Sequence, residues 1–237
     1  MALQYKSDTH DTIAILMPWG RVSRFALINS DDIPIHTDLV LVGGGHSHLF
    51  VLEHFAMHPH PGVRLALVTR DLHTPYSGML PGLIAGHYSF EETHIDLQSL
   101  ARHCGAALVH AEVTGIDADG MFLHFADRPP LAYDLLSLNI GSRPYQADSA
   151  ALARQVSVKP VDGFLAAWNR IQTQLSSSAA GLRVAVVGGG AGGVELILAM
   201  EQRARQLDGI LLLELFTDAT ELLPAHNPRV PGRFRLI

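Results

Sequence analysis

The sequence predicts an α/β protein with two doubly wound parts, and three observations support this fold class. First, two short apolar runs, 39–42 and 182–187, each lead into three consecutive glycines. Second, an apolar stretch with helical spacing follows each set of glycines. Third, another apolar run comes after each of these stretches. Both copies therefore read as strand, helix and strand, which is the repeating unit of a parallel sheet.

The second copy carries the complete glycine pattern. Gly188, Gly190 and Gly193 have the spacing G-x-G-x-x-G. Gly188 allows a tight turn, Gly190 lets the backbone approach a pyrophosphate, and Gly193 lets the helix pack close to the sheet. The N–H groups at the start of the helix and its dipole favour phosphate. The motif therefore predicts a dinucleotide site, and a glycine-rich structural turn is the alternative.

The first copy departs from this pattern at one position. Gly43 and Gly45 occupy the first two glycine positions, but His48 stands where the third glycine belongs. A side chain at this close-packing point is expected to push the helix slightly away from the strand. The two copies support each other. Two dinucleotide sites in one chain suggest a flavin and a nicotinamide, with a hydride passing between them.

Neither copy has the usual acidic residue that binds the ribose at the end of the second strand. The first copy has Thr69, Arg70 and then Asp71, and the second reaches Asp218 only after two uncharged residues. Asp71 and Asp218 are therefore candidates from one position later, and backbone groups are the alternative. Arg70 reads either as a contact for a 2′-phosphate or as a solvated surface arginine.

The composition excludes several classes of protein. The chain has 237 residues, 48% of them hydrophobic, and a net charge of −6, which argues against a nucleic-acid surface. Cys104 is the single cysteine, so there is no internal disulfide and no zinc–cysteine cluster. The sequence shows neither an apolar run of membrane-spanning length nor a signal peptide. A reducing, cytoplasmic setting is therefore expected.

Histidines gather near the first glycine turn and raise the alternative of a metal site. The group consists of His46, His48, His54, His58 and His60. No carboxylate or cysteine accompanies them in a ligand pattern. Positions in turns and on an outer helix face explain them more simply, so no metal site is predicted.

The remaining sequence suggests how the domains are arranged. Residues 1–36 show no clear period and are predicted to be a flexible leader. Residues 37–145 form a first domain, in which Asp119-Gly120 predicts a hairpin within a small antiparallel β insert. Residues 146–237 form a second, incomplete domain. The stretch 74–82 is dense in turn formers at a strand–helix corner, which favours a cofactor-contacting loop over an ordinary one.

Several motifs together resemble one superfamily. GGGHSH, HTPYSGMLPG, HIDL, VKP and GGGAGGVEL come in the order of the flavoproteins with two dinucleotide-binding domains, the pyridine nucleotide-disulfide oxidoreductase superfamily. The similarity is greatest to FAD-containing NADH dehydrogenase-like proteins associated with selenide,water dikinase, and runs from about Asp38 to Arg229. It implies a Rossmann-like FAD domain with the antiparallel insert, and a partial second Rossmann-like domain for NAD(P)H.

The resemblance also implies cofactor-binding residues. For FAD they come from the first glycine turn, the 74–82 loop and a later strand end: Gly43, Gly45, Ser47, His48, Thr74, Tyr76, Ser77, Gly78, Met79, Pro81, Gly82, Asn139, Ile140 and Gly141. For NAD(P)H they come from the second glycine turn: Gly188, Gly190, Ala191, Gly193 and Glu195. Lys159 matches a Lys-Pro pair at the crossing between domains, with a surface role as the alternative to an approach to the flavin.

The implied activity is hydride transfer from NAD(P)H to FAD, then electron transfer to an acceptor such as a quinone. No catalytic acid, base or nucleophile is expected, because the flavin carries the chemistry. Cys104 alone cannot supply the redox pair of a disulfide reductase. The superfamily's returning C-terminal segment has no counterpart in the sequence. We therefore expect a C-terminally truncated chain that holds FAD weakly and shows little turnover unless a second polypeptide completes the fold.

Other implications of the resemblance are less direct. It implies peripheral membrane association through the missing C-terminal region, and association with selenide,water dikinase. The residues do not distinguish NADH from NADPH. The alternative function is a non-catalytic nucleotide-binding fragment or a redox-sensing module.

Overall fold

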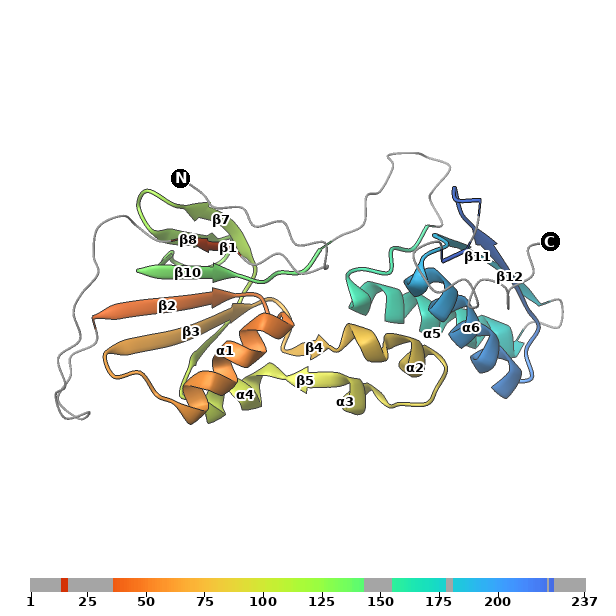
Figure 1. The fold of residues 1–237 in the computed structure, drawn as a ribbon, viewed down its shortest axis with the longest axis horizontal. Helices are drawn as coiled ribbons and strands as arrows, with labels where there is room; N and C mark the ends of the chain where they lie inside the picture. Colours follow the sequence, from red (N-terminus) through yellow and green to blue (C-terminus); the bar gives the residue numbers. More distant parts are fainter. Residues whose placement is uncertain (1–13, 17–35, 143–154, 178–180, 221, 224–237) are drawn as a thin grey trace. The chain divides into compact units, whose positions relative to one another are not determined.

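The computed structural model describes residues 14–16, 36–142, 155–177, 181–220 and 222–223 (Figure 1). The chain divides into two compact units. The first contains the described residues of Met1–Thr74 and His94–Arg143, and the second contains those of Pro75–Thr93 and Pro144–Ile237. The segment between Thr74 and His94 thus interrupts the first unit and contributes to the second.

A five-stranded sheet forms the centre of the first unit. In spatial order its strands are β1 (Ala14–Leu16), β10 (Leu135–Leu138), β2 (Thr37–Val42), β3 (Val63–Thr69) and β6 (Ala107–His110). The last four are parallel to one another. The chain runs outward from β2 through β3 to β6, and then returns to place β10 on the other side of β2. The strand order therefore reverses at β2, and such a switch point is where open α/β sheets bind ligands.

The strand β1 differs from the sequence prediction for the leader. Its apolar Ala-Ile-Leu triplet pairs antiparallel with β10, with Ala14 opposite Leu138. The pairing satisfies backbone groups at what would otherwise be an open edge of β10. Residues 14–16 of the predicted leader thus form a strand of the sheet. Apart from His36, the remainder of the predicted leader lies outside the described residues.

Each face of this sheet is covered by a different layer. One face packs against α1 (His46–Met57) and α4 (Leu97–His103), through buried leucines that include Leu41, Leu52 and Leu67. The other face packs against the predicted antiparallel insert, where Leu123 is fully buried. The insert consists of β7 (Val113–Asp117), β8 (Phe122–Phe125) and β9 (Leu131–Ala132).

The segment after β3 carries short elements into the second unit. These are the 3-10 turn η2 (Ser77–Met79), α2 (Leu80–Ile84) and α3 (Phe90–Thr93). They are flanked by β4 (His73–Pro75), which spans the boundary between the units, and by β5 (His94–Asp96) of the first unit, and β4 pairs with β5. Leu80 and Ile84 are buried with Trp168 and Met200 in one core. The sequence-based boundaries assigned this segment to the first domain. The structure differs because the apolar face of α2 is covered by the second unit.

The second unit is built on two parallel strands. It contains α5 (Val161–Ser177), β11 (Leu182–Val187), α6 (Ala191–Gln206) and β12 (Leu211–Phe216). Side chains alternate strictly along both strands. One face of this pair, including Val184 and Leu213, packs on the core, whereas Val187 and Phe216 on the other face are 83% and 53% exposed. The predicted α/β fold is confirmed, with a Rossmann-like parallel sheet in the first unit and a partial one in the second. Among the described residues, no helix has the length and apolarity needed to cross a bilayer.

Candidate functional site

The first glycine turn lies at the switch point of the five-stranded sheet, between β2 and α1. Gly43 has φ +94°, a conformation that favours glycine. A Cβ at Gly43 would overlap the backbone carbonyl of Asn139, which directly follows β10. The N–H of Gly45 donates to that same carbonyl at 3.2 Å. The predicted FAD residues of the turn and of the 139–141 strand end are thus brought together within one unit.

The side chain of Asn139 is fully buried beside this turn. Neither amide atom has a hydrogen-bond partner among the described residues. The amide occupies the space that a Cβ on Gly45 would need. Buried polar groups without a hydrogen-bond partner are rare in folded proteins, and a bound water or ligand is the usual explanation. The Asn139 amide is therefore a candidate polar contact for a ligand at this turn. Beyond it, Ile140 is 71% exposed and Gly141 has φ +74°.

His48 lies beneath the turn rather than on its outer surface. The side chain is 1% exposed. Its Nδ1 donates to the Gly43 carbonyl at 2.7 Å, and its Nε2 lies 2.9 Å from Ser137 Oγ on β10. Both ring nitrogens are therefore held by protein groups. The imidazole thus supports the turn from inside, and contact of His48 with a cofactor stays a prediction. Sequence reasoning missed Ser137, although a serine two residues before Asn139 in an apolar strand was the available signal.

Burial gives His48 a predictable effect on stability. Desolvation lowers the pKa of His48 below its ordinary value of 6.5, partly offset by the hydrogen bond to Gly43. Between the lowered pKa and 6.5 the unfolded chain binds more protons than the folded one, so stability falls as the pH drops through this window. Urea unfolding between about pH 5 and pH 8 should show this loss in the wild type and a smaller loss in His48→Asn. Equal acid sensitivity of the two proteins would contradict the assignment.

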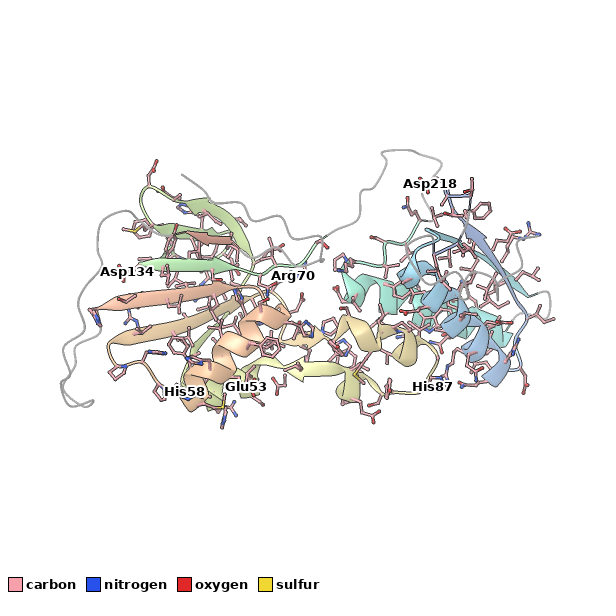
Figure 2. All side chains as sticks on the ribbon, viewed as in Figure 1. Glu53, His58, Arg70, His87, Asp134 and Asp218 are labelled. Atoms are coloured by element: carbon pink, nitrogen blue, oxygen red, sulfur yellow. The ribbon has the colours of Figure 1, made fainter. Side chains whose placement is uncertain are left out.

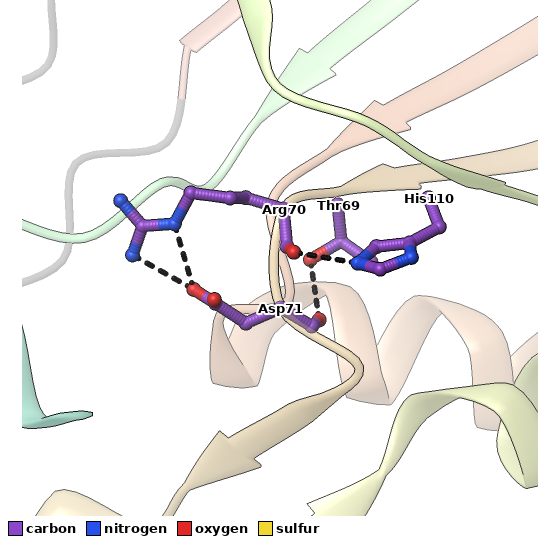
Figure 3. A network of polar contacts seen from close by, with 4 residues as sticks. All are labelled: Thr69, Arg70, Asp71 and His110. Atoms are coloured by element: carbon purple, nitrogen blue, oxygen red, sulfur yellow. Dashed lines mark hydrogen bonds and ion pairs between the residues drawn. The ribbon is translucent and has the colours of Figure 1, made fainter.

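At the end of β3, the two candidate nucleotide contacts, Arg70 and Asp71, form an ion pair with each other (Figure 3). Arg70 donates from Nε and Nη2 to one oxygen of Asp71, at 3.0 and 2.8 Å. The Thr69 hydroxyl donates to the Asp71 carbonyl, and His110 Nε2 donates to the Arg70 carbonyl at 2.9 Å. The network fixes this corner of the sheet. Because the ion pair is exposed, it adds little stability.

In the second unit, each glycine of the second turn has its own physical reason. Gly188 has φ +122°. A Cβ at Gly193 would overlap the Gly188 carbonyl oxygen, so close packing of α6 on β11 requires this glycine. A Cβ at Gly190 would meet no atom within 4 Å. Packing within the chain therefore does not require glycine at 190, and the space above the turn is left open.

Both helices that follow the turns begin without a capping side chain. Gly45 precedes α1 and Gly190 precedes α6, and neither helix has an acidic residue in its first turn. The N–H groups of a first turn need acceptors, and phosphate oxygens are suitable ones. Ala191 begins α6, and Glu195 lies exposed one turn further along. Asp218 is exposed just after β12 (Figure 2).

The predicted FAD loop is divided between the two units. Thr74 belongs to the first unit, whereas Tyr76, Ser77, Gly78, Met79, Pro81 and Gly82 belong to the second. Tyr76, Ser77 and Gly78 are exposed, and Gly82 packs against the ring of Tyr88. Contact of this loop with a cofactor stays a prediction, as does the role of Lys159.

The described histidines are not arranged as a metal centre. No group of three or more His, Cys, Asp or Glu side chains among the described residues is placed to hold a metal ion. His54 and His60 approach each other on the surface, with their Nε2 atoms 3.4 Å apart, and His58 stacks on His54.

Cys104 has a structural environment. It follows the C-terminus of α4, and its Sγ donates to the Ala101 carbonyl at 3.3 Å. A serine hydroxyl can make the same bond. We therefore expect Cys104→Ser to keep the far-ultraviolet circular dichroism spectrum and to change NADH-linked dye reduction by less than about twofold. Complete loss of dye reduction in a folded variant would show that the thiol has a chemical role.

The chain is similar in sequence and in fold to known proteins. The sequence is 28% identical over 179 residues to the NADH dehydrogenase-like protein YutJ of Bacillus subtilis (strain 168), covering 73% of this chain and 47% of YutJ. The structure of NDH2 from Plasmodium falciparum in complex with NADH superposes with a TM-score of 0.67 at 17% identity, covering 83% of this chain and 44% of NDH2. This chain has the fold of the pyridine nucleotide-disulfide oxidoreductase type.

Another protein of this fold is the sulfide:quinone oxidoreductase from Aquifex aeolicus. It superposes with a TM-score of 0.60 at 17% identity over 79% of this chain and 44% of its own. No protein-family model matches the sequence. The chain spans about half the length of the relatives it matches. The resemblance seen in the sequence motifs is thus confirmed for the fold.

Proposed function

We propose that the first unit binds FAD, that the second unit binds NAD(P)H, and that the chain belongs to an NAD(P)H dehydrogenase. When bound, the flavin would accept a hydride from the reduced nicotinamide and pass its electrons to an acceptor. The protein's own part is to bind and orient the two nucleotides and to exclude water. This assignment agrees with the name of the relative YutJ and with the NADH complex of NDH2.

The residues of the first turn fit an FAD pyrophosphate. Gly43 and Gly45 allow a close backbone approach, and the first turn of α1 has no capping side chain. The orphaned amide of Asn139 offers donors and an acceptor beside this turn, directly or through a water. We infer that Ser47, Ile140 and Gly141 border the same cofactor. Their contacts are carried over from the sequence resemblance.

The open space above Gly190 is the observation that carries the proposal for the second unit. A Cβ at Gly190 would meet no described atom within 4 Å, and α6 begins beside it without a capping side chain. A dinucleotide pyrophosphate has the charge and shape for such a place. Ala191 and Glu195 would lie near the nucleotide at the start of α6. An exposed Asp218 after β12 favours the ribose hydroxyls of NADH over the 2′-phosphate of NADPH.

A quinone is the proposed electron acceptor. The fold similarity to sulfide:quinone oxidoreductase supports this class of acceptor. A cytoplasmic location, peripheral membrane attachment and association with selenide,water dikinase stay predictions of the sequence resemblance.

A visible spectrum tests the proposed function. The purified protein, titrated with FAD, should shift the flavin absorbance band, and the band should bleach when NADH is added without oxygen. Bound FAD that NADH does not bleach would instead favour a non-catalytic nucleotide-binding module. Failure to bind any FAD would overturn the assignment of the first unit.

A further inference from the structure

The two glycine turns differ in how the following helix packs against the turn. In the second unit, glycine at position 193 brings α6 so close to the turn that a Cβ would overlap the Gly188 carbonyl. In the first unit the corresponding residue, His48, has a complete side chain, so α1 must stand further from the turn. The carbonyl of Gly43, which corresponds to Gly188, receives a hydrogen bond from the imidazole at 2.7 Å.

The partners of His48 define its tautomer. The Gly43 carbonyl can only accept, so Nδ1 carries the proton. In the neutral ring Nε2 is then an acceptor, and the Ser137 hydroxyl donates to it at 2.9 Å. His48 therefore connects three segments: the turn through Gly43, the helix that carries it, and the neighbouring strand β10. Asn139, two residues after Ser137, receives the N–H of Gly45 on its backbone carbonyl.

We propose that His48 and Ser137 are positioning residues that hold the first glycine turn in the shape that accepts the FAD pyrophosphate. This inference rests on the proposed function of the first unit. The imidazole does not touch the cofactor. It fixes the Gly43 carbonyl and spaces α1 from β10, so that the backbone of the turn and the N-terminus of α1 present a fixed surface.

The glycine motif by itself suggests that glycine at position 48 would improve FAD binding, and the proposal predicts the opposite. Replacing His48 by glycine would restore the motif spacing, yet it would leave the Gly43 carbonyl and the Ser137 hydroxyl buried without their partner. It would also open a cavity beneath the turn, because the ring is 1% exposed. The variant with the motif-like sequence is therefore expected to bind FAD more weakly than the wild type.

FAD titrations of matched variants test the proposal. The amide nitrogen of asparagine corresponds to Nδ1 of histidine, so His48→Asn keeps a donor for Gly43, whereas His48→Gly and His48→Leu keep none. We expect the Gly and Leu variants to lose at least about tenfold in FAD affinity, and the Asn variant to bind several-fold tighter than either. His54→Asn changes an exposed histidine of the same helix and is the control, with wild-type affinity expected.

A double variant separates positioning from general destabilisation. Ser137→Ala should weaken FAD binding in the wild type but add nothing to His48→Asn, since the shorter amide does not reach β10. NADH affinity and the thermal midpoint of the FAD-free protein are measured on every variant to confirm folding. The proposal is overturned if His48→Gly binds FAD as tightly as the wild type, or if Leu and Asn bind alike. Failure of the wild type itself to bind FAD would instead overturn the proposed function.

Discussion

Replacing Gly190 by valine is expected to abolish NADH binding while leaving the protein folded. Gly190 has φ −76°, and a Cβ there meets no atom within 4 Å, so the folded chain accepts valine without strain. The branched side chain would fill the space that the pyrophosphate needs. We expect at least a hundredfold loss of affinity, about 2.7 kcal/mol, measured by titration of nicotinamide fluorescence.

Gly163→Ala is the matched control for this experiment. Gly163 lies in α5, and a Cβ there also meets nothing within 4 Å. Alanine should stabilise that helix by up to about 1 kcal/mol and leave NADH binding as in the wild type. If Gly190→Val bound NADH with unchanged affinity, the second turn would be a structural turn only.

Replacing Gly43 by alanine is expected to damage both the stability of the first unit and its affinity for FAD. The backbone at φ +94° costs a residue with a side chain roughly 1–2 kcal/mol. The new Cβ would also overlap the Asn139 carbonyl and lie 2.9 Å from the Ile140 Cα. Displacing this buried backbone costs about 1–3 kcal/mol more. Urea unfolding of the FAD-free protein and FAD titration measure the two effects.

Gly105→Ala measures the conformational part of this cost alone. The difference from Gly43→Ala then gives the part that comes from the overlap with Asn139. Gly105 also has a positive φ, +68°, but a Cβ there meets no atom within 4 Å. Its replacement should cost only the conformational part, roughly 1–2 kcal/mol, and should not affect FAD binding. If Gly43→Ala and Gly105→Ala lowered the free energy of unfolding equally, the close contact between the turn and Asn139 would not contribute to stability.

The sequence predicted those features that depend on neighbouring residues. Strand Leu182–Val187 has the predicted bounds, and the predicted hairpin around Asp119-Gly120 is present. The reasons for glycine at 188 and 193 agree with the φ value and the Cβ contacts in the structure. Short apolar runs and turn residues determine such features locally.

Features that depend on distant residues escaped prediction. The partner of His48 is Ser137, 89 positions later, so motif spacing placed the histidine at the packing point of the helix but could not identify its partner. The apolar residues of α2 looked like part of a loop, because the helices that bury them come much later in the chain. The pairing of β1 required knowing that β10 lies at the sheet edge.

The interleaving of the two units has a consequence for protein synthesis. Leu80 and Ile84 leave the ribosome roughly a hundred residues before Leu196 and Met200, with which they share a core. At about 5–20 residues per second, this delay lasts on the order of ten seconds. During that time α2 is an apolar helix without its partners on the nascent chain, which is the kind of surface that chaperones bind. The core that α2 shares with α6 can form only once translation has passed Met200.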